Sequence, residues 1–174
     1  MKKEVFAKKI YEVSHLVGEF KLRSGIVSNE YFDKYLFESD PELLHEISLY
    51  MKELIPEETD LLAGLEMGGI PIATAVSLNS GMKCMFVRKN SKEYGTCKLA
   101  EGTEFAGKKV CVIEDVVTSG GQIIKSVNEL RERGAVVDSV LCVILRDSKA
   151  LDLLKKEGLE LRYVLSMDYI KSNI

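Results

Sequence analysis

The stretch VCVIEDVVTSGGQ, residues 110–122, decides the fold. It opens with four apolar residues, which are typical of a strand buried on both faces of a parallel sheet. Two adjacent carboxylates, Glu114 and Asp115, follow at the carboxyl end of that strand, and a turn of small residues, 118–121, opens a helix. In open parallel sheets, ligands bind beyond the carboxyl ends of the strands. The stretch therefore predicts a strand–turn–helix unit with a ligand site at its rim.

The turn and the two acids suit different parts of one ligand. A glycine-rich turn that leads into a helix presents backbone N–H groups at the positive end of the helix dipole, which favours a phosphate. Ionised carboxylates only accept hydrogen bonds, so Glu114 and Asp115 suit sugar hydroxyls or the water ligands of a metal. The stretch lacks the G-K-[ST] of a P-loop and the G-x-G-x-x-G of a dinucleotide fold. An ordinary turn capped by Thr118 or Ser119 is the alternative.

The rest of the chain predicts an α/β fold. From residue 60 onward, expected strands at 61–64, 83–87, 109–113, 136–145 and 161–167 alternate with expected helices at 70–78, 122–133 and 149–157. Such alternation predicts parallel pairing with right-handed crossovers. Before it we expect a helix over 5–17 that includes His15, an irregular stretch over 18–38, and a helix that starts at Ser39, Asp40 and Pro41. Without a repeat or a linker, residues 1–174 form one expected domain.

Composition excludes several classes of protein. The 174 residues are 46% hydrophobic and carry a net charge of −3, so no global basic field favours nucleic acid. No apolar run approaches the ~20 residues of a membrane span, and the first residues do not form a signal peptide. The four cysteines show no zinc spacing. They indicate a reducing compartment, so we expect a cytoplasmic protein with no membrane or nucleic-acid partner.

A cationic segment, VRKNSKEYGTCKLAEG, covers residues 87–102. Arg88, Lys89 and Lys92 precede Tyr94, and the segment has no helical or strand period. A solvated charged loop is the ordinary interpretation. A polyanionic substrate of a net-negative protein nevertheless needs cations, and a long loop without periodicity is typical of a lid that excludes water.

The 110–122 stretch resembles the phosphoribosyl pyrophosphate (PRPP) signature of type I phosphoribosyltransferases. The resemblance implies a parallel sheet core flanked by helices, at about residues 41–174, under a small amino-terminal hood at about 1–40. It implies that Glu114 and Asp115 hold the ribose hydroxyls. The residues that would cradle the 5-phosphate are Val116, Val117, Thr118, Ser119, Gly120, Gly121 and Gln122.

Two further segments are similar to orotate phosphoribosyltransferases. In that family the cationic loop crosses to the neighbouring subunit and binds pyrophosphate, which implies these roles for Arg88, Lys89 and the catalytic Lys92, and a homodimer through the 88–102 loop. Many members carry a histidine where this chain has Tyr94, whose phenol can form hydrogen bonds but is not cationic at neutral pH.

The stretch FKLRSGIVSNEYFDKY, residues 20–35, carries the second similarity. It implies that Arg23 approaches the pyrophosphate and that Tyr31 and Phe32 form part of the base pocket, although the two aromatic side chains could equally be hood core. Arg146, which ends the expected strand VLCVILR, and Thr118 would contact orotate; a plain surface arginine is the alternative. Met67 and Gly68 replace a Tyr-Lys pair of many members, which removes a lysine contact.

Together these resemblances imply an orotate phosphoribosyltransferase of UMP biosynthesis. It would transfer phosphoribosyl from PRPP to orotate and give orotidine 5′-monophosphate and pyrophosphate. Mg²⁺ would be carried by PRPP, with no direct protein ligand. Two alternatives stay open: a phosphoribosyltransferase for a purine or for uracil, and a non-enzymatic regulator that senses PRPP on the same fold.

Overall fold

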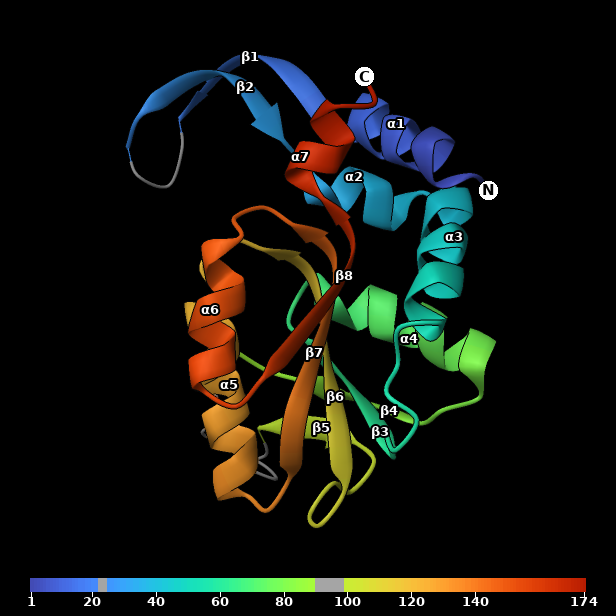
Figure 1. Ribbon diagram of the computed structural model, residues 1–174, viewed down its shortest axis with the longest axis vertical. Helices are drawn as coiled ribbons and strands as arrows, with labels where there is room; N and C mark the ends of the chain where they lie inside the picture. Colours follow the sequence, from blue (N-terminus) through green and yellow to red (C-terminus); the bar gives the residue numbers. More distant parts are fainter. Residues whose placement is uncertain (22–24, 90–98) are drawn as a thin grey trace.

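The computed structural model describes residues 1–21, 25–89 and 99–174 of the chain. In these ranges the main sheet has six strands in the order β5-β4-β3-β6-β7-β8 (Figure 1). All neighbouring strands pair in parallel except β4 and β5, which are antiparallel. The strands are β3 (Leu61–Leu65), β4 (Cys84–Val87), β5 (Ala100–Gly102), β6 (Lys109–Val117), β7 (Val136–Leu145) and β8 (Glu160–Ser166).

Helices cover both faces of this sheet (Figure 1). Helices α3 (Pro41–Lys52) and α4 (Gly69–Ser80) lie on one face, and α5 (Gly121–Glu132) and α6 (Lys149–Lys156) lie on the other. Successive side chains of a strand point to opposite faces. Val112 therefore joins the cluster under α5 and α6, whereas Cys111 and Ile113 join the cluster under α3 and α4. By this alternation Asp115 follows Ile113 on the α3–α4 face.

A hood lies over the carboxyl ends of the parallel strands (Figure 1). It consists of α1 (Lys3–Ser14), the antiparallel hairpin of β1 (His15–Lys21) and β2 (Val27–Phe32), and α2 (Lys34–Ser39). The short helix α7 (Met167–Lys171) packs beside α1, where the Tyr169 hydroxyl lies 3.3 Å from Glu4 Oε1. Residues from both ends of the described chain therefore stand above the strand ends.

Several expected boundaries differ from the structure. The first helix ends at Ser14 rather than at residue 17, and His15 opens β1 instead of lying in a helix. The reason is tertiary: the buried Ser14 accepts a hydrogen bond from Asp33 N at 2.8 Å, which starts the pairing of β1 with β2. Helices α2 and α7 and the edge strand β5 were not expected from the sequence. All three are too short to show a clear period.

The strand of the deciding stretch is longer than expected. β6 does not end at residue 113 but continues to Val117, because its parallel pairing with β7 extends to Val117 and Leu145. Glu114 and Asp115 thus belong to the strand itself, four and three residues before the turn. A regular backbone therefore fixes where the two carboxylates point.

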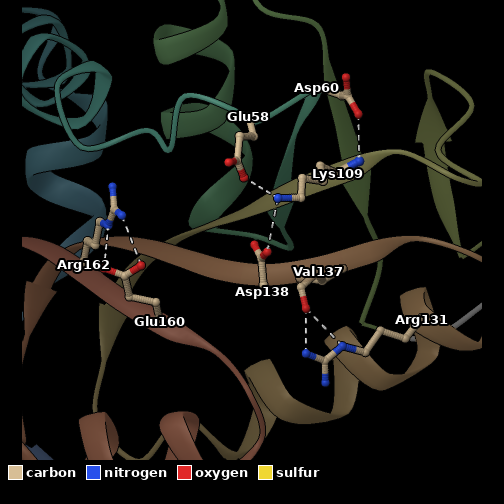
Figure 2. A network of polar contacts seen from close by, with 8 residues as sticks. All are labelled: Glu58, Asp60, Lys109, Arg131, Val137, Asp138, Glu160 and Arg162. Atoms are coloured by element: carbon tan, nitrogen blue, oxygen red, sulfur yellow. Dashed lines mark hydrogen bonds and ion pairs between the residues drawn. The ribbon is translucent and has the colours of Figure 1, made fainter.

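The opposite end of the sheet carries a polar network (Figure 2). At the start of β6, Lys109 pairs with Glu58 and lies 3.7 Å from Asp138. At the start of β8, Arg162 donates to both carboxylate oxygens of Glu160 at 2.9 and 3.1 Å. These residues stand at the amino ends of the strands and so lie away from the hood.

None of the helices within the described ranges has the length and apolar character needed to cross a membrane.

Candidate active site

The acid pair lies at the junction of core and hood. Asp115 is only 1% exposed, and its carboxylate accepts a hydrogen bond from Val116 N. The backbone N–H of Asp115 in turn donates to Glu114 Oε2 at 3.2 Å. Glu114 is less buried than its neighbour. The two carboxylates are therefore held by strand backbone.

Two residues of the hood helix α2 reach this pair. Nζ of Lys34 forms an ion pair with Oδ2 of Asp115, and Glu38 is buried with 6% exposure close to the same carboxylate. The sequence passage that predicted the base pocket includes Lys34, but neither Lys34 nor Glu38 was assigned a role. Their position four residues apart on one helix face is a pattern shared by many structural pairs.

Burial and mutual repulsion shift the titration of this cluster. Burial, with the nearby charge of Asp115, raises the pKa of Glu38 to about 9. Burial and Asp115 likewise raise the pKa of Glu114 to about 8. Burial works against the charge of Lys34, but the contact with Asp115 outweighs it, so the pKa of Lys34 is raised. The cluster therefore favours protonated Glu38 and Glu114 beside a charged lysine at neutral pH.

The loop after β3 packs directly on Asp115. A Cβ added at Gly68 would lie 1.5 Å from Asp115 Oδ2, and one at Gly69 would lie 2.2 Å from the Ile113 carbonyl oxygen. Gly68, where relatives of this type were expected to carry a lysine, thus permits the loop to approach the acid pair. Met67 beside it is 61% exposed. The chain thus has a close backbone contact with Asp115 at the position where a lysine side chain was expected.

The turn after β6 has the geometry expected of a phosphate cradle. Gly120 adopts a left-handed conformation with φ of 78°, and α5 begins at Gly121. Thr118 and Ser119 are exposed at the rim, and in the described chain no side chain caps the first turn of α5. The amino end of the helix, with the positive end of its dipole, therefore faces outward beyond the strand.

A cavity of about 210 Å³ lies between the hood and the carboxyl end of β7. It brings together three residues that the sequence analysis assigned to the base, namely Tyr31, Phe32 and Arg146. Arg146 N donates to Val117 O at 2.8 Å, which places Arg146 beside Thr118. The assigned base and phosphate residues thus share one rim of the sheet.

The same cavity has lining residues that the sequence analysis did not select. They are Tyr11, His15, Ser28, Glu30, Met167 and Lys171. His15 was expected to lie in the first helix, but its ring nitrogen lies 2.9 Å from Glu30 Oε2 and its ring stacks on Tyr11. These residues come from α1, the hairpin and α7, and no motif in the sequence links them.

Part of the cationic segment is described. Lys89 N donates to Glu66 Oε2 at 3.1 Å, which ties the start of the segment to the loop after β3. Arg88 lies 3.6 Å from Glu101 Oε1. Arg23, Lys92 and Tyr94 lie outside the described residues, so their predicted roles stay predictions.

Comparison with known proteins agrees with this geometry. The family model "Phosphoribosyl transferase domain" matches residues 38–168. An orotate phosphoribosyltransferase of Nocardioides sp. is 53% identical over 154 residues, which cover 88% of this chain and 86% of that protein. One from Methanocella arvoryzae is 44% identical over 145 residues, 83% of each chain.

Solved structures agree as well. The orotate phosphoribosyltransferase of Mycobacterium tuberculosis H37Rv in complex with Fe(III) dicitrate superposes with a TM-score of 0.87 and 29% identity over 97% of this chain and 98% of the other. The same enzyme in complex with PRPP gives a TM-score of 0.82 with 27% identity over 97% and 98% of the chains. The chain belongs to the phosphoribosyltransferase family and, within it, to the orotate phosphoribosyltransferases.

Proposed function

We propose that this protein transfers the phosphoribosyl group of PRPP to orotate and releases orotidine 5′-monophosphate and pyrophosphate. The observation that carries the proposal is the shared rim. The acid pair and the phosphate turn lie at the carboxyl end of β6, and a cavity lined by Arg146, Tyr31 and Phe32 lies at the carboxyl end of the adjacent strand β7, where Arg146 N donates to Val117 O. A sugar held by the acids and a base held in the cavity would lie side by side.

The described residues fit the parts of this reaction. The amides at the start of α5 would bind the 5-phosphate, and the acids would accept hydrogen bonds from the ribose hydroxyls. Arg146 would bind the planar carboxylate or carbonyl groups of orotate with parallel hydrogen bonds, and an aromatic face of the pocket would cover the ring. N1 of orotate would then attack C1 of the sugar with inversion while pyrophosphate leaves.

The magnesium ion, the dimer and the cellular location belong to the same proposal. Mg²⁺ would be carried by PRPP rather than by direct protein ligands. Such an ion would neutralise charge on the departing pyrophosphate. We also propose a cytoplasmic homodimer in which the 88–102 loop reaches the neighbouring site, with no nucleic-acid or membrane partner.

A panel of bases tests the substrate directly. The protein would be incubated with PRPP, Mg²⁺ and orotate, uracil or a purine in turn, and the loss of orotate followed by absorbance. We expect turnover with orotate and little with the others. Turnover of another base alone would support the alternative phosphoribosyltransferase. PRPP binding without any turnover, together with a gel shift of nucleic acid, would support the regulator.

Two substitutions test the assigned chemistry. Asp115→Asn removes a negative charge near the positive sugar, and Lys92→Ala removes a cation from the leaving pyrophosphate. Removal of one preorganised electrostatic group costs roughly 10²–10³ in turnover, so we expect losses of that size from steady-state assays. Asp138→Asn, at the far end of the sheet, is the matched control and should keep wild-type turnover. Near-normal rates of either site variant would contradict the assignment.

A further inference from the structure

The four charged residues at and around Asp115 come from two parts of the molecule, the core and the hood. Glu114 and Asp115 come from β6 of the core, whereas Lys34 and Glu38 come from α2 of the hood. Lys34 and Glu38 are four residues apart, so both side chains leave α2 on the same face. That face contacts Asp115, because Lys34 forms an ion pair with it and Glu38 lies within hydrogen-bonding reach of it. Asp115 of the core is thus contacted by two residues of the hood.

One buried carboxylate oxygen of this cluster, Oε1 of Glu38, has no donor among the described residues. Glu38 itself is 6% exposed. If Glu38 and Asp115 were both ionised, the two buried carboxylates would repel each other, and Oε1 of Glu38 would accept no hydrogen bond. A proton on Glu38 removes both problems, because the carboxylic acid then donates to Asp115. The raised pKa of Glu38, about 9, agrees with this state.

Lys34 balances the charge that remains. Its side chain is 34% exposed, whereas that of Asp115 is 1% exposed, so the lysine closes the acid from the solvent side. Among the described residues, the carboxyl and ammonium groups that interact with Asp115 are those of Glu38 and Lys34 from α2 and Glu114 from β6. From the loop after β3, the backbone at Gly68 packs against the Asp115 carboxylate. With Glu38 protonated, the positive charge of Lys34 is paired with the negative charge of Asp115.

We propose that Lys34 and Glu38 are positioning residues that act through Asp115, so that the carboxylate that binds the ribose is ionised and correctly aimed only when the hood is docked on the core. Lys34 keeps the carboxylate charged, and Glu38 fixes its orientation with a donated hydrogen bond. This inference rests on the proposed function, which gives Asp115 its role toward the sugar. Neither residue needs to touch the base.

Four variants separate charge from hydrogen bonding. Lys34→Met removes the cation but keeps an apolar stem, and Lys34→Arg keeps the charge. Glu38→Gln keeps a donor, because its amide can replace the carboxylic acid, whereas Glu38→Leu cannot donate. Lys8→Met and Glu12→Gln are the matched controls, since that exposed pair on α1 is 3.8 Å apart with both side chains 59% exposed.

The readouts are KM for PRPP, KM for orotate, kcat and calorimetric binding of PRPP, each between pH 6 and pH 10. We expect Lys34→Met and Glu38→Leu to raise KM and Kd for PRPP about tenfold or more, with KM for orotate nearly unchanged. Lys34→Arg and Glu38→Gln should stay within about threefold of wild type at pH 7. The wild-type KM for PRPP should rise near pH 9 as Glu38 ionises, and Glu38→Gln should not show this rise.

Several results would overturn the inference. One is a Lys34→Met variant with wild-type affinity for PRPP; another is a Glu38→Gln variant that behaves like Glu38→Leu at pH 7. Equal losses for PRPP and orotate would indicate a merely structural role. Should Glu38→Leu not fold, the pH profile of Glu38→Gln decides alone. Should orotate not react at all, the proposed function fails, and the calorimetric binding of PRPP still tests the positioning.

Discussion

At the scale of single residues, the acid pair illustrates what a sequence motif contains and what it omits. The identity and order of Glu114 and Asp115 follow from the motif, and so does the glycine turn. The close contact of Gly68 with Asp115 does not, because residues 47 positions apart meet only in the folded chain. The same holds for Lys34. Its sequence stretch, residues 20–35, predicts part of the base pocket, but its side chain contacts Asp115.

Gly68→Ala tests how tightly the loop after β3 must pack. Its Cβ would lie 1.5 Å from Asp115 Oδ2, so the loop or the carboxylate must move. We expect KM for PRPP to rise at least about tenfold, since a displacement of this order at a site costs roughly 10²-fold at worst. Steady-state kinetics with varied PRPP measures the effect. Gly18→Ala, whose Cβ would lie 3.2 Å from the edge of the Phe20 ring and not near Asp115, should leave KM for PRPP unchanged.

At the scale of elements, the long strands and helices were predictable and the short ones were not. The helices over 70–78 and 122–133 were expected within three residues of α4 and α5, because Gly81 and Gly134 mark their ends. Helix α2 has six residues and was expected as irregular chain. It forms because Asp33 caps its first turn and because Phe37 and Glu38 are buried against the core. The second cause is tertiary and has no local signal.

The caps of α2 and α3 give a matched pair of predictions. Asp33 accepts a hydrogen bond from Tyr35 N at 3.1 Å, and Asp40 accepts from Glu42 N and Leu43 N at 2.9 and 3.0 Å. Loss of such a cap costs about 1 kcal/mol, so Asp33→Ala and Asp40→Ala should each lower the free energy of unfolding by that amount in urea titrations. Only Asp33→Ala should also raise KM for PRPP, because α2 alone carries Lys34 and Glu38. An equal rise of KM in both variants would show that the helix has no special link to the site.

At the scale of the whole molecule, the α/β core was predictable and the assembly of the hood was not. Alternating strands and helices determine the parallel order, and only the short antiparallel strand β5 departs from it. The hood, in contrast, combines α1, the hairpin, α2 and the distant α7, and contacts between such distant segments leave no periodic pattern. The sequence therefore pointed to Tyr31, Phe32 and Arg146 among the residues that line the cavity under the hood, but not to His15 or Lys171.

Docking of the hood should make stability depend on pH. The pKa of Glu38 is raised to about 9, so the folded protein keeps a proton that the unfolded chain loses above its usual pKa of 4.5. Its stabilising contribution is complete below that usual value and is lost as the pH rises toward 9, at up to about 1.4 kcal/mol per pH unit. Glu114, with its pKa raised to about 8, has the same sign.

Urea unfolding of wild type and Glu38→Gln between pH 6 and pH 9 measures this dependence. We expect the wild type to lose stability more steeply than the variant. Glu58→Gln is the control, because pairing with Lys109 lowers the pKa of Glu58, and its effect on stability should be constant above pH 6. Parallel curves for wild type and Glu38→Gln would contradict protonation of Glu38 in the fold.

The hydrogen bond from Arg146 N to Val117 O has a consequence for how this enzyme could change its preferred acceptor. The ends of β6 and β7 are paired in register, so the spacing between Asp115 and Arg146 is set by two adjacent strands, about 4.8 Å apart. Substitutions that favour another acceptor could therefore change this spacing very little. The hairpin of β1 and β2 lines the same cavity through Ser28, Glu30 and Tyr31. Replacing this hairpin with that of a relative would therefore change the cavity and leave the paired ends of β6 and β7 in place.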